Sequence, residues 1–285
     1  MSSSNPHRPG GVLVIGSINE DVIMLVPRAP RPGETLTAKR TDRRAGGKGA
    51  NQAVAAARAR AEVRMLGRVG DDAAGTRMLD ALRDEGVDTD LVEIACATPT
   101  GAAYITVTDD GENAIVLDRG ANACLSPADV EGHRETIANA AVLLAQLEIP
   151  VDAVTAAVQA AVGAGVRPVV TLSPAQDVPS ELLAGLDPLL VNEHEAAFLL
   201  GDGAAQGRPE DAAERLLRLG PRSAVITLGA DGAVFATGDG ASSLPAEPTE
   251  KVIDTTGAGD AFAGTLAAAL AAGGELRDAV HAGLA

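Results

Sequence analysis

Short apolar runs alternate with longer segments of helical periodicity along most of the chain. Apolar runs bounded by polar or glycine residues are typical of buried strands, and the Ala/Leu-rich stretches between them are typical of helices. Strands that alternate with helices predict an α/β fold, a doubly wound and mostly parallel sheet flanked by helices. The expected strands are Val12–Ile15, 63–66, 142–147, 169–172, 189–191 and 224–228, and the expected helices are 48–61, 73–85, 151–162, 193–200, 209–219 and 260–272.

Two regions break this alternation and predict a second, smaller sheet. Residues 21–44 hold two extended pieces, 22–26 and 34–43, separated by three prolines. Within residues 101–117, two short runs flank the turn Asp109-Asp110-Gly111, a pattern typical of a β-hairpin. We interpret the segments at about 21–44 and 101–117 as a β-sheet lid over a cleft. A hairpin without such a role is the alternative.

Composition and charge narrow the classes of partner. The 285 residues suit one large α/β domain over 11–285, preceded by a polar leader, 1–10, that we expect to be disordered. The net charge of −16 and the four aromatic residues argue against a nucleic-acid partner. No run of 18 apolar residues occurs, so no membrane partner is expected. Cys96 and Cys124 have no metal-ligand spacing, and a cytoplasmic location follows as the expectation.

Polar and glycine residues follow several predicted strands directly. Residues 16–21 follow the first strand, Glu148 follows 142–147, and 192–195 follow 189–191. Ligands of doubly wound sheets bind beyond the carboxyl ends of the strands, so these positions predict one crevice. Loops at this edge are polar in any such protein, and the pattern alone therefore does not specify the chemistry.

Three glycine-rich segments indicate what the crevice binds. The segment 254–260 opens the last long helix, and small residues at a helix N-terminus let backbone amides approach an anion while Asp260 meets a hydroxyl group. The segments 46–53 and 229–232 also suit close approach of a ligand. An ordinary helix start or a tight turn explains each of them equally well. The chain has no Gly-x-x-x-x-Gly-Lys-Ser/Thr sequence, which excludes a P-loop.

Taken together, these segments resemble the ribokinase group of the phosphofructokinase-B-type sugar kinases. The Asp-Thr-Thr-Gly-Ala-Gly-Asp sequence at 254–260 is specific to that superfamily, and Ser-Ile-Asn-x-Asp at 17–21 with Gly-Gly-Lys-Gly-Ala-Asn-Gln-Ala at 46–53 points to ribokinases within it. Further matching stretches run in family order over nearly the whole chain from Gly11: 67–72, 111–113, 120–122, 143–148, 192–195 and 227–232.

The resemblance implies transfer of a phosphoryl group from ATP to O5 of D-ribose, giving D-ribose 5-phosphate. It implies a catalytic base at Asp260, an anion hole at Gly257, Ala258 and Gly259, and sugar-binding positions at Asn19, Asp21, Gly47, Lys48, Asn51, Glu148 and Asp260. ATP-binding positions would be Asn192, Thr227, Leu228, Gly229, Ala230, Asp231 and Gly232. Glu195 would be linked to Mg²⁺ through water, and Asp254 with the carbonyl of Thr256 would hold a monovalent cation, usually K⁺.

Four further expectations accompany this interpretation. Asp260 at a helix N-terminus is expected to have a low pKa. Family members usually continue beyond the position of Ala285, so the chain is expected to be truncated at its C-terminus with an incomplete cation site. Lid strands often pair between two subunits of such kinases, which implies a homodimer. Two other classes stay open: a kinase for another sugar or a nucleoside, and a non-catalytic sugar-binding derivative.

Overall fold

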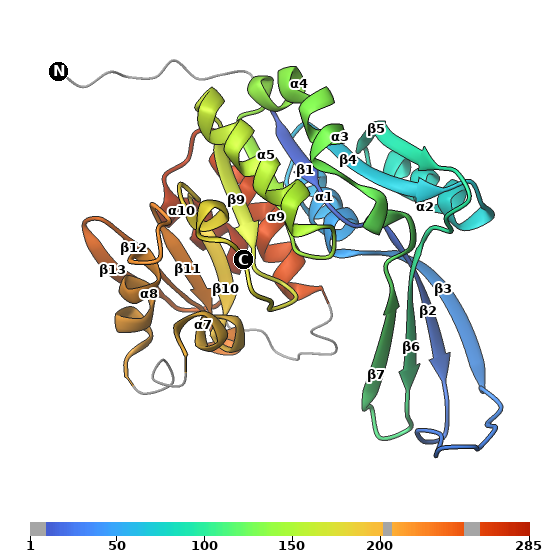
Figure 1. Ribbon diagram of the computed structural model, residues 1–285. Helices are drawn as coiled ribbons and strands as arrows, with labels where there is room; N and C mark the ends of the chain where they lie inside the picture. Colours follow the sequence, from blue (N-terminus) through green and yellow to red (C-terminus); the bar gives the residue numbers. More distant parts are fainter. Residues whose placement is uncertain (1–9, 202–206, 248–256) are drawn as a thin grey trace.

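A large sheet between two helical layers forms the body of the protein, and a small sheet projects from one end of it (Figure 1). The computed structural model describes residues 10–201, 207–247 and 257–285. Within these residues no helix is both long and apolar enough to cross a membrane.

The main sheet has nine strands in the order β13-β12-β11-β10-β9-β8-β1-β4-β5. Every pairing from β5 through β11 is parallel, whereas β12 and β13 add an antiparallel edge. Central strands of a parallel sheet are covered on both faces, so their residues form continuous apolar runs in the sequence. The strands are β1 Val12–Ile15, β4 Val63–Gly70, β5 Asp88–Ala95, β8 Val142–Ala145, β9 Arg167–Thr171, β10 Leu189–Asn192, β11 Ala224–Thr227, β12 Ala233–Thr237 and β13 Gly240–Leu244.

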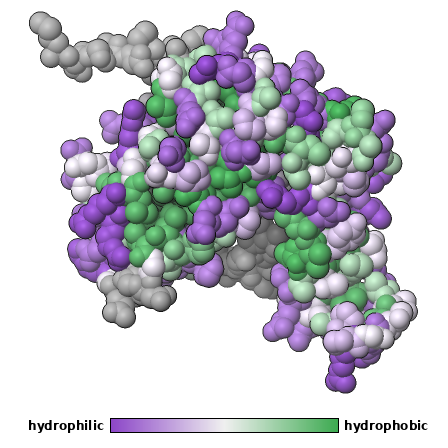
Figure 2. Space-filling model, in the orientation of Figure 1, coloured by the Kyte–Doolittle hydropathy of each residue, from purple (hydrophilic) through white to green (hydrophobic). Residues whose placement is uncertain are grey.

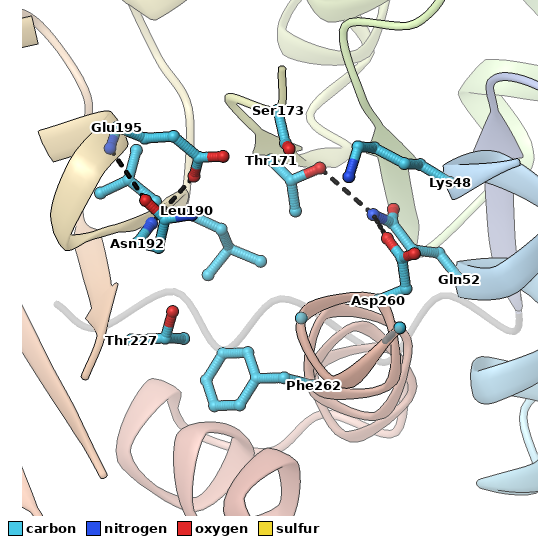
Figure 3. A pocket seen from close by; sticks show the side chains of 13 residues that line it. Lys48, Gln52, Thr171, Ser173, Leu190, Asn192, Glu195, Thr227, Asp260 and Phe262 are labelled. Carbon is cyan, nitrogen blue, oxygen red and sulfur yellow. Dashed lines mark hydrogen bonds between the residues drawn. The ribbon is translucent and has the colours of Figure 1, made fainter. Parts of the chain in front are cut away.

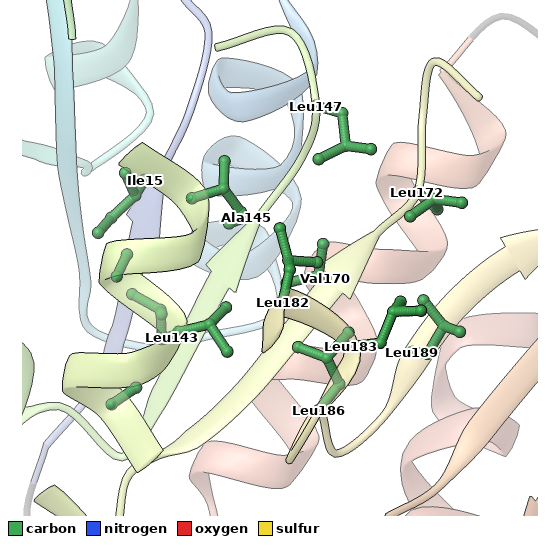
Figure 4. Packing of buried hydrophobic residues seen from close by; sticks show 14 of the residues in the cluster. Ile15, Leu143, Ala145, Leu147, Val170, Leu172, Leu182, Leu183, Leu186 and Leu189 are labelled. Carbon is green, nitrogen blue, oxygen red and sulfur yellow. The ribbon is translucent and has the colours of Figure 1, made fainter. Parts of the chain in front are cut away.

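Each face of the main sheet packs against its own layer of helices. Alternate residues of β1 enter opposite cores: Leu13 and Ile15 join one cluster, and Val12 and Val14 join the other. Figure 4 shows the first cluster, in which Leu143 and Val170 pack under the helices. That face carries α3 Pro127–Gly132, α4 Arg134–Asn139, α5 Val151–Ala164, α6 Ser180–Leu183, α7 Glu193–Leu200 and α8 Pro209–Leu217, and the other carries α1 Lys48–Arg58, α2 Ala73–Asp84, α9 Ala258–Ala271 and α10 Leu276–Leu284.

The small sheet has four strands in the order β3-β2-β6-β7, and we call it the lid sheet. Its strands are β2 Asn19–Leu25, β3 Arg40–Gly46, β6 Gly101–Val107 and β7 Asn113–Asp118. Side chains alternate across a strand, so Asn19 and Asp21 share one face of β2 while Glu20 lies on the other. The described residues also include the short 3₁₀ turns η1 Gly120–Cys124 and η2 Gly229–Asp231.

The doubly wound fold and the separate small sheet are both confirmed. The boundaries differ in places, because residues 34–39 precede β3 instead of belonging to it and β2 begins at Asn19. Strands β5 and β13 and helices α3, α4 and α6 were not predicted. Strand β5 lies at the edge of the main sheet and is half exposed, so it has no continuous apolar run to identify it.

Candidate active site

A cavity of about 220 Å³ lies at the carboxyl ends of β9, β10 and β11, where the sequence predicts a crevice. Figure 3 shows Lys48, Gln52 and Asp260 on one side of this cavity and Asn192, Glu195 and Thr227 on the other. The remaining lining residues are Thr171, Ser173, Leu190, Val191, Gly257, Gly259 and Phe262.

Asp260 lies in the first turn of α9, at the wall of the cavity. Gly257 caps the helix in the left-handed conformation (φ 78°), and no side chain caps the first amides, so these N–H groups are available to an anion. Asp260 is 8% exposed. Its Oδ1 accepts a hydrogen bond from Gln52 Nε2 (2.9 Å) and its Oδ2 accepts one from Asn51 Nδ2 (3.1 Å).

The expectation of a low pKa for Asp260 is wrong. Burial raises the pKa of this carboxyl above its usual value, and Glu148 adds to the increase. The charge of Lys48 and the hydrogen bonds from Gln52 and Asn51 act in the opposite direction but do not offset the loss of hydration. The helix N-terminus therefore does not decide the pKa at this position; burial does.

Glu148 connects three segments that are far apart in the sequence. Its Oε2 accepts hydrogen bonds from Ser17 Oγ (2.6 Å), from the backbone N–H of Lys48 (3.2 Å) and from Asn19 Nδ2 (3.4 Å). Asn122 Nδ2 donates in turn to Asn19 Oδ1 (2.7 Å). The end of β8, the start of α1 and the start of the lid sheet are thereby fixed relative to one another.

Asp21 brings a third carboxylate to this region. A Cβ atom added at Gly46 would lie 2.3 Å from the Asp21 carboxylate, so a larger residue there would displace this carboxylate. Burial raises the pKa of Asp21 to about 6, and the neighbouring charges of Glu148 and Asp260 contribute to the increase. The structure therefore brings Asn19, Asp21, Lys48, Asn51, Glu148 and Asp260 together, with Gly47 (φ 91°) at the start of α1.

The other side of the cavity begins with a capping box. The side chain of Asn192 accepts a hydrogen bond from the backbone of Glu195 (2.8 Å), and the backbone of Asn192 donates to Glu195 Oε2 (2.9 Å). Such a capping box stabilises the start of a helix in any protein. Asn192 and Glu195 therefore do not by themselves indicate a nucleotide site. Of the predicted ATP-binding loop, only Thr227 lines the cavity; Leu228, Gly229, Ala230, Asp231 and Gly232 form the turn at η2 just beyond β11.

Of the residues expected to hold the two cations, Glu195 lies in the described part of the chain. Glu195 is 7% exposed and lines the cavity, and a single carboxylate suits a cation held mainly by phosphate oxygens and water. The described residues include no group of three or more acidic, histidine or cysteine side chains that could hold a metal ion directly. Asp254 and Thr256 lie outside the described residues.

Four polar residues of the site had no predicted role. Gln52, Thr171 and Ser173 line the cavity, and Asn122 supports Asn19 from η1. Gln52 follows Asn51 in the glycine-rich segment, and Asn122 lies in a stretch that matches the family. Their position in these motifs is the sequence feature that could have identified both residues. Thr171 and Ser173 lie on and just after β9, and only the packing of the strands brings them to the cavity.

The comparisons with known proteins agree with this architecture. The model of the family described as "pfkB family carbohydrate kinase" matches residues 10–285, and the chain belongs to this family. It is 39% identical over 280 residues to the ribokinase of Schizosaccharomyces pombe, a match that covers 95% of this chain and 88% of that protein. A bifunctional ribokinase/ribose-5-phosphate isomerase A of Fructilactobacillus sanfranciscensis is 40% identical over 261 residues, which is 91% of this chain and 48% of that longer protein.

A solved structure extends the similarity to three dimensions. The ribokinase of Arabidopsis thaliana in complex with ribose and ATP superposes with a TM-score of 0.87 at 31% identity, covering 95% of this chain and 89% of that one. The similarity in three dimensions therefore covers nearly the whole chain.

Proposed function

We propose that this protein transfers the γ-phosphoryl group of ATP to O5 of D-ribose and releases ADP and D-ribose 5-phosphate. The observation that carries the proposal is the position of Asp260. Its carboxylate lies at a helix N-terminus that no side chain caps, between a cluster of carboxylate and amide side chains and a cavity that continues toward β10 and β11. This arrangement suits a base between a sugar and the phosphate that it receives.

The sugar would bind among the carboxylate and amide groups at the base of the lid sheet. Adjacent hydroxyl groups of a sugar both donate and accept, and paired carboxylates and amides provide complementary partners. We assign Asn19, Asp21, Gly47, Lys48, Asn51, Glu148 and Asp260 to the sugar site. Asp21 and Glu148 enter from different elements, so they can contact different hydroxyl groups.

Asp260 acts as the base in the proposed reaction. As O5 of the sugar forms a bond to the γ-phosphorus, the bond from that phosphorus to the β,γ-bridging oxygen breaks and ADP leaves with the electron pair. The O5 proton passes to Asp260 and then to solvent. The amides at Gly257, Ala258 and Gly259 stabilise the charge that develops on the phosphoryl oxygens, the main contribution that proteins make to phosphoryl transfer.

We assign the opposite side of the cavity to the nucleotide. Asn192 and the residues Thr227, Leu228, Gly229, Ala230, Asp231 and Gly232 would contact ATP. When bound, Mg²⁺ would neutralise phosphate charge, and Glu195 would hold its water ligands. For K⁺, we keep Asp254 and the carbonyl of Thr256 as the expected ligands; in the sequence they directly precede the proposed anion hole at Gly257, Ala258 and Gly259.

The proposal also includes the role of the lid sheet, the oligomeric state and the cellular location. We assign residues 11–285 to one domain whose lid, at about 21–44 and 101–117, limits access of water to the sugar. Water would otherwise compete as the phosphoryl acceptor. We further propose a homodimer formed through the lid. The two free cysteines, Cys96 and Cys124, suit a cytoplasmic location.

An ADP-release assay over a panel of acceptors tests the proposal. The panel contains ribose, 2-deoxyribose, arabinose, fructose, glucose and adenosine, and ³¹P NMR identifies the product. We expect the highest kcat/KM with ribose and a 5-phosphate product. A clear preference for another acceptor would reassign the enzyme within its family, and binding of ribose without ADP release would indicate a non-catalytic sugar-binding protein.

A further inference from the structure

Two buried glutamines lie behind the proposed catalytic base. Gln52 belongs to α1 and is 1% exposed, and Gln146 follows β8 and is fully buried. Neither has a role in the mechanism described above. A buried amide side chain has two donor hydrogens and an acceptor oxygen to satisfy, so its hydrogen-bond partners indicate its role.

Hydrogen bonds connect the two glutamines to Asp260 in series. Gln146 Nε2 donates to Gln52 Oε1 (2.8 Å), and Gln52 Nε2 donates to Asp260 Oδ1 (2.9 Å). Gln52 Nε2 also donates to Thr171 Oγ1 (3.2 Å) on β9. Figure 3 shows the Gln52 amide between Thr171 and Asp260. The series thus runs from the central sheet through α1 to the first turn of α9.

The orientation of the Gln52 amide has chemical consequences. A reversed amide would place Gln52 Oε1 against Asp260 Oδ1, an arrangement that an ionised carboxylate disfavours and that a protonated one could accept. The donor of Gln146 opposes this reversal, because it needs Gln52 Oε1 on its own side. The hydrogen bond from Gln146 therefore favours the orientation in which Gln52 Nε2 faces Asp260.

One buried atom shows that this orientation has a cost. Gln146 Oε1 is buried and has no hydrogen-bond partner among the described residues. It lies against Gly16, where an added Cβ would be 1.9 Å from it. An unpartnered buried acceptor is unfavourable and calls for an explanation. Orientation of the donor toward Gln52 is that explanation.

We propose that Gln52 and Gln146 are positioning residues for Asp260: Gln146 fixes the amide of Gln52, and the Gln52 N–H fixes one carboxylate oxygen and favours the ionised base. The inference rests on the proposed function of Asp260. It agrees with the opposing effects on the pKa of Asp260, which burial raises and the Gln52 hydrogen bond lowers. The charged groups that also face Asp260 are Lys48 on α1, Glu148 after β8 and Asp21 on β2.

An NMR titration of Asp260 in the free enzyme tests this proposal without any substrate. The protein is labelled with ¹³C at the aspartate carboxyl carbons, and the Asp260 signal is assigned by its loss in Asp260→Asn. Methionine is unbranched and similar in length to glutamine, so Gln52→Met and Gln146→Met remove the amides at small packing cost. The control is Gln176→Met, which removes a hydrogen bond to the carbonyl of Leu147 (2.8 Å) and none to Gln52 or Asp260.

The expected results distinguish positioning from a structural role. Gln52→Met should raise the pKa of Asp260 by about one unit, the effect of losing a hydrogen bond to a charged group. Gln146→Met should shift it in the same direction, and the double variant should match Gln52→Met, because both act through one bond. The acid limb of the kcat profile should move with the pKa. Gln176→Met should shift neither.

Two outcomes would overturn the inference. One is an unchanged pKa of Asp260 in folded Gln52→Met, and the other is additive shifts in the double variant. If Gln52→Met does not fold, as judged from its melting curve, an unchanged pKa in Gln146→Met decides against the proposal. Since the titration needs no sugar, absence of ribose kinase activity would count against the proposed function alone.

Discussion

At the scale of single residues, burial controls the chemistry of the site. Asp21 and Asp260 both have raised pKa values because the fold removes water from them, and each lies close to other carboxylates. A raised pKa makes an aspartate a stronger base in its ionised form, which suits a group that must take a proton from a sugar hydroxyl. Because the pKa of Asp21 is about 6, the same burial makes the charge of Asp21 sensitive to mildly acidic pH.

The first prediction concerns the base. Asp260→Asn retains the size of the side chain and removes the proton acceptor. We expect kcat to fall by roughly 10²–10⁴-fold, the usual contribution of a positioned general base, with little change in ribose affinity. Coupled assays give kcat, and calorimetry gives the affinity. The control is Asp239→Asn in the exposed turn after β12. A kcat close to wild type in Asp260→Asn would disprove the assignment.

The second prediction concerns Asp21 and pH. Its pKa of about 6 means that the carboxylate accepts sugar hydrogen bonds above that pH and is protonated below it. Ribose affinity should therefore weaken as pH falls below about 6. Asp21→Asn should weaken binding by about 1.5–3 kcal/mol, the contribution of a charge-assisted hydrogen bond, and should reduce the pH dependence. Calorimetry between about pH 5 and about pH 8, a range that spans the ionisation of the Asp21 carboxyl, measures both effects.

The ionisation of Asp21 has opposite effects on ribose binding, which it strengthens, and on the stability of the fold, which it lowers. A folded-state pKa raised from 3.8 to about 6 means that ionisation opposes folding. The contribution of Asp21 to the free energy of unfolding is therefore most favourable below pH 3.8 and declines as pH rises toward about 6. Asp21→Asn should remove this part of the pH dependence in urea denaturation. Identical pH profiles of wild type and Asp21→Asn, for affinity and for stability, would contradict the assignment.

At the scale of elements, two closely packed helices carry the proposed base and its hydrogen-bond partners. Helix α1 carries Lys48, Asn51 and Gln52, and α9 carries Asp260. A Cβ atom at Gly264 of α9 would lie 2.4 Å from the carbonyl oxygen of Gln52 and 2.6 Å from Cβ of Ala55. The small residues of both helices thus set the separation of the base from its hydrogen-bond partners.

The third prediction tests this packing. Gly264→Ala should lower the free energy of unfolding by about 1–3 kcal/mol, the typical cost of overpacking a core, although alanine favours helix formation. It should also lower kcat, because α1 is pushed away from Asp260. Gly163→Ala on α5 is the matched control: nothing lies within 4 Å of its added Cβ. That variant should gain roughly 0.5–1 kcal/mol. Equal stability of both variants, measured by urea denaturation, would contradict the packing argument.

The fourth prediction concerns the connection between the lid sheet and α2. The Glu20 side chain on β2 is 5% exposed and accepts from Arg77 Nη2 of α2 (2.6 Å) and from Arg43 of β3. Since Glu20 lies between Asn19 and Asp21, these two ion pairs fix the strand that carries two of the proposed sugar-binding residues. Arg43→Met and Arg77→Met should each cost about 1 kcal/mol, the net value of one hydrogen bond. The double variant should cost more than their sum, because it leaves a buried carboxylate unpaired.

Thermal denaturation and ribose KM measure the outcome for these variants. The control is Lys39→Met, which breaks an ion pair with Asp109 in which both side chains are more than half exposed. Such pairs contribute about 0–1 kcal/mol. Strict additivity of the two arginine variants, or an unchanged KM in the double variant, would show that the pair does not position β2.

The sequence predicts the individual helices and strands better than the contacts between them. Apolar runs such as Val12–Ile15 identify central strands because both faces are covered. The same rule misses β5, an edge strand whose charged residues face solvent. Motif spacing places Asp260 at a helix start, yet its pKa depends on burial and on Gln52, which is 208 positions away. Contacts of that separation depend on the strand order, and no local pattern encodes it.

At the scale of the whole molecule, the lid sheet has two different edges. Strand β3 carries Arg40, Arg43 and Arg44, and charged residues at an edge oppose pairing with another chain. Strand β7 carries the uncharged run Ile115, Val116 and Leu117, of which Val116 is 68% exposed. Tyr104 on β6 is also exposed, and Figure 2 shows hydrophobic side chains over this part of the lid. Exposed apolar patches of this kind mark interfaces.

The last prediction is that the lid sheets of two copies associate through β7. Light scattering after size exclusion should give the mass of a dimer for the wild type and of a monomer for Val116→Lys, because a desolvated charge disfavours the interface. Val162→Lys on α5 is the control: Val162 is an exposed apolar residue outside the lid. Dissociation should also raise the ribose KM, since an unsupported lid closes less completely over Asn19 and Asp21. A monomeric wild type, or a dimer that persists in Val116→Lys, would show that the apolar edge of β7 does not form the interface.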